Sequence, residues 1–144
     1  MGTPTTARRP PLLTALATGL AAALTMLVLD LTWLGVVAKP AYAWMGALLR
    51  PDPVLPAAAL FYVCYVAAVV WFAVYGAANG RDALRRGAAM GAVAYGTYEL
   101  TNWAVVQGWP AALVPIDWAW GIALTGIVAW VGKQVQTRLT GGTP

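Results

Sequence analysis

Two long segments without a charged residue constrain this chain more than any other feature. Pro10 to Leu29 and Pro53 to Gly80 contain no Asp, Glu, Lys or Arg. Since about 20 apolar residues suffice for a helix to cross the hydrocarbon core, each segment is long enough to span a membrane. Only 10% of all residues are charged, whereas soluble domains carry about 25%. The sequence therefore indicates an integral membrane protein and excludes a soluble or disordered chain.

Four apolar stretches predict an all-α fold with four transmembrane helices in an antiparallel bundle. The predicted spans are 12–37, 56–78, 83–106 and 111–131, which form one transmembrane domain over 12–131 between tails 1–11 and 132–144. Asp82 is predicted to cap the third span. Gly87 and Gly91 give that span a face of small residues, which allows close approach of another helix. Pro40 to Leu49 forms either a short interfacial helix or an ordinary loop.

The basic residues predict how the bundle is oriented. The four-span arrangement puts seven of them on one side and two on the other, and an excess of Lys and Arg marks the cytoplasmic side. The seven are Arg8, Arg9, Arg81, Arg85, Arg86, Lys133 and Arg138, and the two are Lys39 and Arg50. We therefore expect both tails to be cytoplasmic. The positive charges are too few and scattered for a nucleic-acid partner.

Three of the five acidic residues fall inside predicted spans, at one depth. Asp30 lies seven residues before the end of the first span and Glu99 seven before the end of the third, so each lies about 10 Å below the outer boundary. Asp117 lies six residues into the fourth span, at about 9 Å. Buried carboxylates are costly and usually face the bundle interior. We expect at least one of these acids to be protonated at neutral pH, and all three are candidate catalytic residues.

Polar and aromatic residues surround the acids at helical spacing. Donors of this kind can satisfy buried carboxyl oxygens, so these residues are predicted to line a ligand site. They are Trp33, Tyr62, Tyr95, Asn102, Trp103 and Trp120. The chain has no histidine and one cysteine, so we predict neither a metal site nor a cofactor. The alternative for Asp30 and Glu99 is that they only hold helices together, and Asp117 alternatively favours a helix N-terminus.

The chain resembles the small bacterial membrane proteins catalogued as domain of unknown function 2177. The resemblance rests on LDLTWLGVVAKPAY (Leu29–Tyr42), FYVCY (Phe61–Tyr65), AYGTYELTNWAVVQGWP (Ala94–Pro110) and IDWAWG (Ile116–Gly121). It implies four spans, a location in the bacterial cytoplasmic (inner) membrane and no established activity. The family usually has Asp where this chain has Glu99. The carboxyl group is therefore kept, but the side chain that carries it is longer.

Three functions fit these observations. The first is a pocket in the outer half of the bilayer that binds or modifies a lipid or isoprenoid-like ligand, with an acid acting on protons. The second is proton- or cation-coupled transport, for which one chain encloses little volume, so a homodimer would be required. The third is a structural or accessory membrane protein whose acids only fix helix packing. Membrane lipid is a predicted partner in each case.

Overall fold

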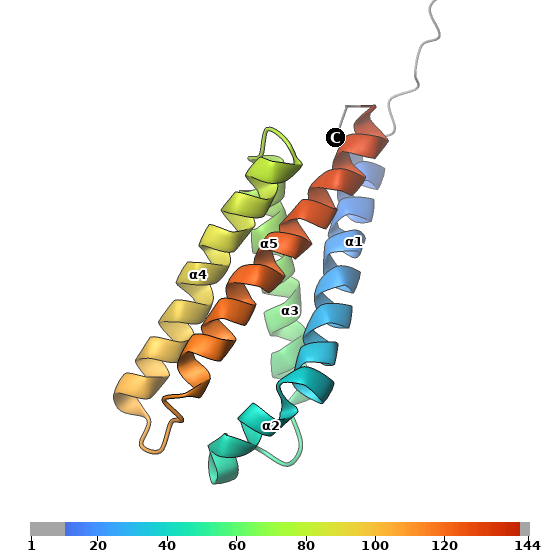
Figure 1. Ribbon diagram of the computed structural model, residues 1–144. Helices are drawn as coiled ribbons and strands as arrows, with labels where there is room; N and C mark the ends of the chain where they lie inside the picture. The colour runs from blue at the N-terminus through green and yellow to red at the C-terminus, as the bar shows by residue number, and fades with distance from the viewer. Residues whose placement is uncertain (1–10, 142–144) are drawn as a thin grey trace, which may run out of the picture.

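The described residues, 11–141, form a helical bundle without a strand in the computed structural model (Figure 1). The all-α prediction is therefore confirmed for these residues. The long helices are α1 (Pro11–Thr32), α3 (Leu55–Val69), α4 (Gly80–Val105) and α5 (Leu113–Thr140). Two segments of π-helix, Trp33–Val37 and Val70–Tyr75, extend α1 and α3 at their C-terminal ends. Arg8 and Arg9, on which part of the predicted orientation depends, lie outside the described residues.

The long helices run alternately up and down, with α5 in the middle. Figure 1 shows α5 passing between α4 and α1, and it contacts both of them along the bundle. The first turn of α1 and the last turn of α5 lie at the same end as the α3–α4 connection. The α4–α5 connection and the short helix α2 (Lys39–Tyr42) lie at the opposite end. We call these two ends the terminal end and the α2 end.

Three helical segments are long and apolar enough to cross a membrane. They are Pro11–Val37, Leu55–Tyr75 and Leu113–Thr140. The fourth predicted span lies on α4, which is not among them. Its first two turns carry Arg81, Asp82, Arg85 and Arg86, and its second half combines Glu99 with Tyr, Thr, Asn and Gly residues of low hydropathy. Many apolar side chains of the three segments are exposed, as expected of surfaces that face lipid.

Glycines on both helices let α4 and α5 pack closely. A Cβ atom at Gly87 would overlap Thr125, and one at Gly91 would overlap the backbone carbonyl of Gly121. The predicted small-residue face of α4 is therefore where α5 approaches. Next to this contact, Leu124 and Val128 of α5 are buried in the apolar core together with Val74.

The ends of α4 and α5 differ from the predicted boundaries. Asn79, not Asp82, caps α4, because the Asn79 side chain accepts a hydrogen bond of 3.0 Å from the Asp82 amide. The prediction for Asp82 is therefore wrong. Its carboxylate accepts instead from the Ala78 amide at 2.9 Å and from Arg86 at 3.0 Å, and both contacts lower its pKa. Helix α5 continues to Thr140, well into the predicted C-terminal tail.

The segment between α1 and α3 is mostly helical. After α2, a 3-10 helix covers Ala43–Leu48 and is kinked at Gly46, where φ is 52°. Pro40 to Leu49 is therefore not an extended loop. Whether it lies in the membrane interface stays a prediction.

Candidate functional site

Asp30 of α1 joins three helices near the α2 end of the bundle. Its Oδ2 accepts a hydrogen bond of 2.5 Å from the Tyr62 hydroxyl of α3, and its Oδ1 accepts one of 3.4 Å from the Trp120 indole of α5. The Asp30 side chain is buried, at 7% exposure. Both carboxyl oxygens of this acid therefore have a hydrogen-bond donor.

Asp117 of α5 receives its donors from the segments that directly follow α1. Its Oδ1 accepts from the Tyr42 hydroxyl of α2 at 2.5 Å and from the Trp33 indole at 3.4 Å. Burial raises the pKa of Tyr42, and the hydrogen bond to Asp117 raises that pKa further. Tyr42 therefore stays protonated and acts as a donor. This contact ties α2 to the end of the bundle.

A stacked pair of tryptophans connects the two acids. The Trp33 and Trp120 rings have centroids 4.4 Å apart and planes 5° apart. Each follows one acid by three residues on its own helix and donates to the acid of the other helix. Asp30 and Asp117 are thus crosslinked through indoles between α1 and α5, which fixes the positions of both carboxyl groups.

Glu99 of α4 completes the group and is the least satisfied of the three acids. Its Oε2 accepts a hydrogen bond of 3.0 Å from the Trp109 indole in the α4–α5 connection. Its Oε1 is buried without a partner among the described residues. Asp117 is close enough to interact with Glu99 electrostatically. A buried oxygen without a donor leaves this part of the site able to accept a proton, a hydrogen-bond donor or a cation.

The structure brings most of the predicted site residues together, but not all of them. Asp30, Trp33, Tyr62, Asp117 and Trp120 form one hydrogen-bonded cluster, which we call the acid cluster, with Glu99 beside it. Tyr95 packs directly over Gly121 of α5 and edge-on to Tyr65.

Two predicted residues lie away from the acid cluster. Asn102 donates its side-chain amide to the Tyr98 carbonyl of its own helix at 2.9 Å. Trp103 is 54% exposed, in the last turn of α4. Neither contacts an acid through a hydrogen bond among residues 11–141.

Two residues of the site were not among those predicted from the sequence to line it. Tyr42 and Trp109 donate to Asp117 and Glu99, yet both lie in connections. Their distances from the acids along the chain follow no helical period, so spacing could not identify them. The available signal was that both are donors within segments shared with the related family.

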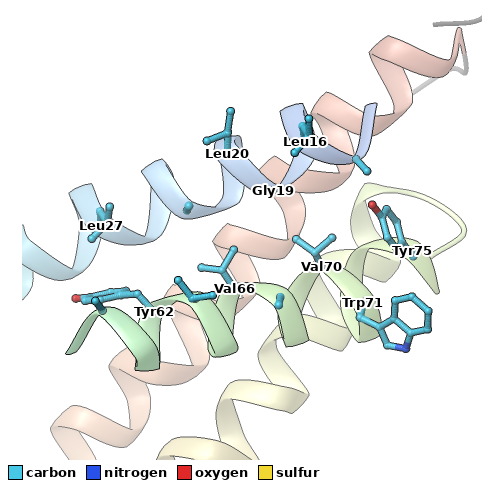
Figure 2. A pocket seen from close by; sticks show the side chains of 14 residues that line it. Leu16, Gly19, Leu20, Leu27, Tyr62, Val66, Val70, Trp71 and Tyr75 are labelled. Atoms are coloured by element: carbon cyan, nitrogen blue, oxygen red, sulfur yellow. The ribbon is translucent and has the colours of Figure 1, made fainter. Parts of the chain in front are cut away.

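A long apolar groove opens between α1 and α3 and ends at the acid cluster. Figure 2 shows Leu16, Leu20 and Leu27 of α1 opposite Val66 of α3 and Val70 of the π-helical segment that follows it, with Tyr62 at one end of the groove. The groove has a volume of about 710 Å³ and is almost entirely apolar. Tyr62 belongs to both features, since its ring lines the groove and its hydroxyl donates to Asp30.

No three His, Cys, Asp or Glu side chains within residues 11–141 are grouped so that they could hold a metal ion. Each of the three acids instead accepts hydrogen bonds from aromatic side chains. The arrangement can therefore bind protons, hydrogen-bond donors and cationic groups.

The fold and these contacts define a helical membrane protein with buried acids. The family described as "Predicted membrane protein (DUF2177)" matches residues 15–134. The chain belongs to this family, as the sequence resemblance predicted. No curated protein and no solved structure matches the chain.

Proposed function

We propose that this protein binds an amphiphilic lipid or isoprenoid-like molecule inside the membrane. The hydrocarbon chain lies in the α1–α3 groove, and the polar end reaches the acid cluster. The observation that carries the proposal is the position of Tyr62, which lines the groove and donates to Asp30. An apolar cavity that ends at a few convergent polar groups is the usual form of a small-molecule site.

The dimensions of the groove support a chain-like occupant. Its lining on α1 extends from Ala15 to Leu27, which corresponds to about 18 Å along the helix. Gly19 lies in the middle of this stretch, and a Cβ atom there would meet no atom within 4 Å. The groove is therefore open at its centre, and its lining is apolar between Tyr62 at one end and Trp71 and Tyr75 at the other.

Blocking the groove at Gly19 tests the proposal. The Gly19→Leu variant adds a side chain in open space, and we expect it to lose a bound lipid that native mass spectrometry detects on the wild type. Gly35→Leu is the matched control, because it adds the same side chain at an exposed helical glycine outside the groove. If Gly19→Leu keeps the same lipid in the same amount, the groove is not the binding site.

The transporter function and the accessory function predict different results for the purified protein. A transporter would show proton-dependent flux in liposomes without a retained lipid. An accessory protein would show neither, and its Asp30→Asn variant would lose stability without losing a ligand. We propose ligand binding first and a catalytic role of Asp30, Glu99 and Asp117 second, because a reaction on the ligand requires that the ligand is bound.

We further propose that α4 is a fourth span and that both tails are cytoplasmic, in a bacterial inner membrane. Helix α4 is about 39 Å long and packs along α5. Lys133, Arg138 and the arginines of α4 all lie toward the terminal end.

Single cysteines at Arg138 and at Arg50, in a Cys64→Ser background, test this orientation. A membrane-impermeant maleimide should label only the Arg50→Cys variant in intact cells. Labelling of Arg138→Cys instead would reverse the orientation.

A further inference from the structure

A second, smaller cavity lies on the opposite side of α3 from the groove. It has a volume of about 250 Å³ and is lined by Phe61, Tyr65, Ala94, Tyr95, Tyr98 and Asp117. The volume is below the range of about 300–1,000 Å³ that is typical of drug-sized ligands, so it suits a compact group. Four of the six lining residues are aromatic and one is an acid. We call this cavity the aromatic cavity.

The aromatic rings of the cavity face in different directions. Phe61 and Tyr65 have centroids 5.4 Å apart and planes 27° apart, whereas Tyr65 and Tyr95 are 6.3 Å apart with planes at 76°. Rings in such orientations form several walls instead of one flat stack. Each ring face carries partial negative charge, so a cation within about 6 Å of the ring centroids is attracted.

The acids beside these rings have no cationic partner in the part of the chain that the structure describes. Asp117 reaches the cavity, and its hydrogen-bond donors Tyr42 and Trp33 are both neutral groups. Glu99 adjoins Asp117 and has a buried Oε1 without a partner. No Lys or Arg lines the cavity. A buried carboxylate without a counter-charge is costly, so a bound cation would relieve the cost.

We infer that the aromatic cavity binds a methylated ammonium group, with the ring faces around its methyl groups and Asp117 as the counter-charge. The cavity offers π faces and a carboxylate, which together are how proteins recognise quaternary ammonium ions. Such a group occurs on small soluble cations such as choline and on the phosphatidylcholine headgroup. The cavity shares Asp117 with the acid cluster, but none of its lining residues belongs to the α1–α3 groove, so the inference does not require a lipid chain in the groove.

Two ligands of the same shape test the inference. Choline and its neutral carbon analogue 3,3-dimethylbutan-1-ol are titrated by calorimetry against the full chain in phosphatidylglycerol nanodiscs. In parallel, native mass spectrometry measures retention of phosphatidylcholine against phosphatidylglycerol. We expect choline or phosphatidylcholine to be bound at least tenfold better than its comparison molecule. Binding of choline alone indicates a soluble cation as the source, and retention of phosphatidylcholine alone indicates the lipid.

Variants locate the binding within the molecule. Asp117→Asn should abolish it, and Phe61→Leu should weaken it about two- to tenfold, because it removes one ring while keeping an apolar side chain. Phe72→Leu is the control, since Phe72 is exposed on the same continuous helix and does not line the cavity. The inference is overturned if neither choline nor phosphatidylcholine is preferred, or if Phe61→Leu and Phe72→Leu have equal effects.

Discussion

Helices α4 and α5 touch along their length, whereas α1 and α3 stand apart around an open groove. Glycine occurs in both pairs, but it acts differently in each. Gly91 is covered by the backbone of α5, while Gly19 faces empty space. At its glycine contact the close pair leaves no room for a ligand between the helices, and the open pair is held by a hydrogen bond from Tyr62 to Asp30 at one end. Glycine thus permits close packing in one pair and lies beside an open groove in the other.

The largest effect should come from filling the close contact. Gly91→Ala places a methyl group against the Gly121 carbonyl, and backbone cannot move aside as a flexible side chain can. We expect unfolding in sodium dodecyl sulfate, followed by circular dichroism, to require about 3 kcal/mol less free energy. A stability equal to that of the wild type would show that α4 and α5 pack more loosely than described.

The next largest effect should come from the hydrogen bond of the open pair. Tyr62→Phe removes the donor to the buried Asp30 carboxylate and should cost about 2 kcal/mol in the same unfolding assay. Tyr75→Phe is the matched control, because Tyr75 lines the same groove and its hydroxyl has no hydrogen bond within residues 11–141. Equal effects of the two variants would mean that the hydrogen bond does not hold α1 and α3 together.

A smaller effect should come from Thr125 at the close contact. Its hydroxyl donates to the Gly121 carbonyl at 2.7 Å and shares a hydrogen bond of 2.9 Å with the Tyr65 hydroxyl. Thr125→Val should therefore cost about 1 kcal/mol. Thr32→Val removes a similar bond to the Val28 carbonyl on an exposed turn and should cost less. A larger loss of stability in Thr32→Val than in Thr125→Val would contradict the expectation that the buried hydroxyl contributes more than the exposed one.

The smallest effect should have the opposite sign. Gly19→Ala puts a methyl group into open space and restricts the unfolded chain, so it should stabilise the protein by about 0.5 kcal/mol. The same substitution at Gly91 is expected to destabilise. If both variants shift stability in the same direction, the contrast between the two helix pairs is incorrect.

Much of the fold could be predicted because the relevant signals are local. The uncharged segments predict α1 and α3, and Gly87 and Gly91 predict the face of α4 that meets α5. The cap of α4 was assigned to the wrong residue, since Asn79 and Asp82 both carry a suitable side-chain oxygen and only the backbone conformation decides between them. The sequence predicted the end of the fourth span at Val131, and helix α5 continues beyond it to Thr140, because polar residues after Val131 extend the helix outside the apolar stretch.

The candidate site was only partly predictable. Helical spacing identified Trp33 and Trp120 as neighbours of the acids on their own helices, but it does not show to which acid each indole donates. The crossed hydrogen bonds depend on how α1 and α5 pack, which no local pattern reveals. Trp103 follows Glu99 by four residues and is nevertheless exposed, because it lies in the last turn of α4.

The π-helical turn after Trp33 has a consequence for the evolution of chain length. The Ala38 amide bonds to the Trp33 carbonyl five residues earlier, at 2.7 Å, so this turn holds one residue more than an α-helical turn. A deletion of one residue between Trp33 and Ala38 would return the turn to α-helical geometry without moving Asp30 or Trp33. Relatives that differ by one residue here can therefore keep the same acid cluster, and sequence comparisons across this point should allow a gap.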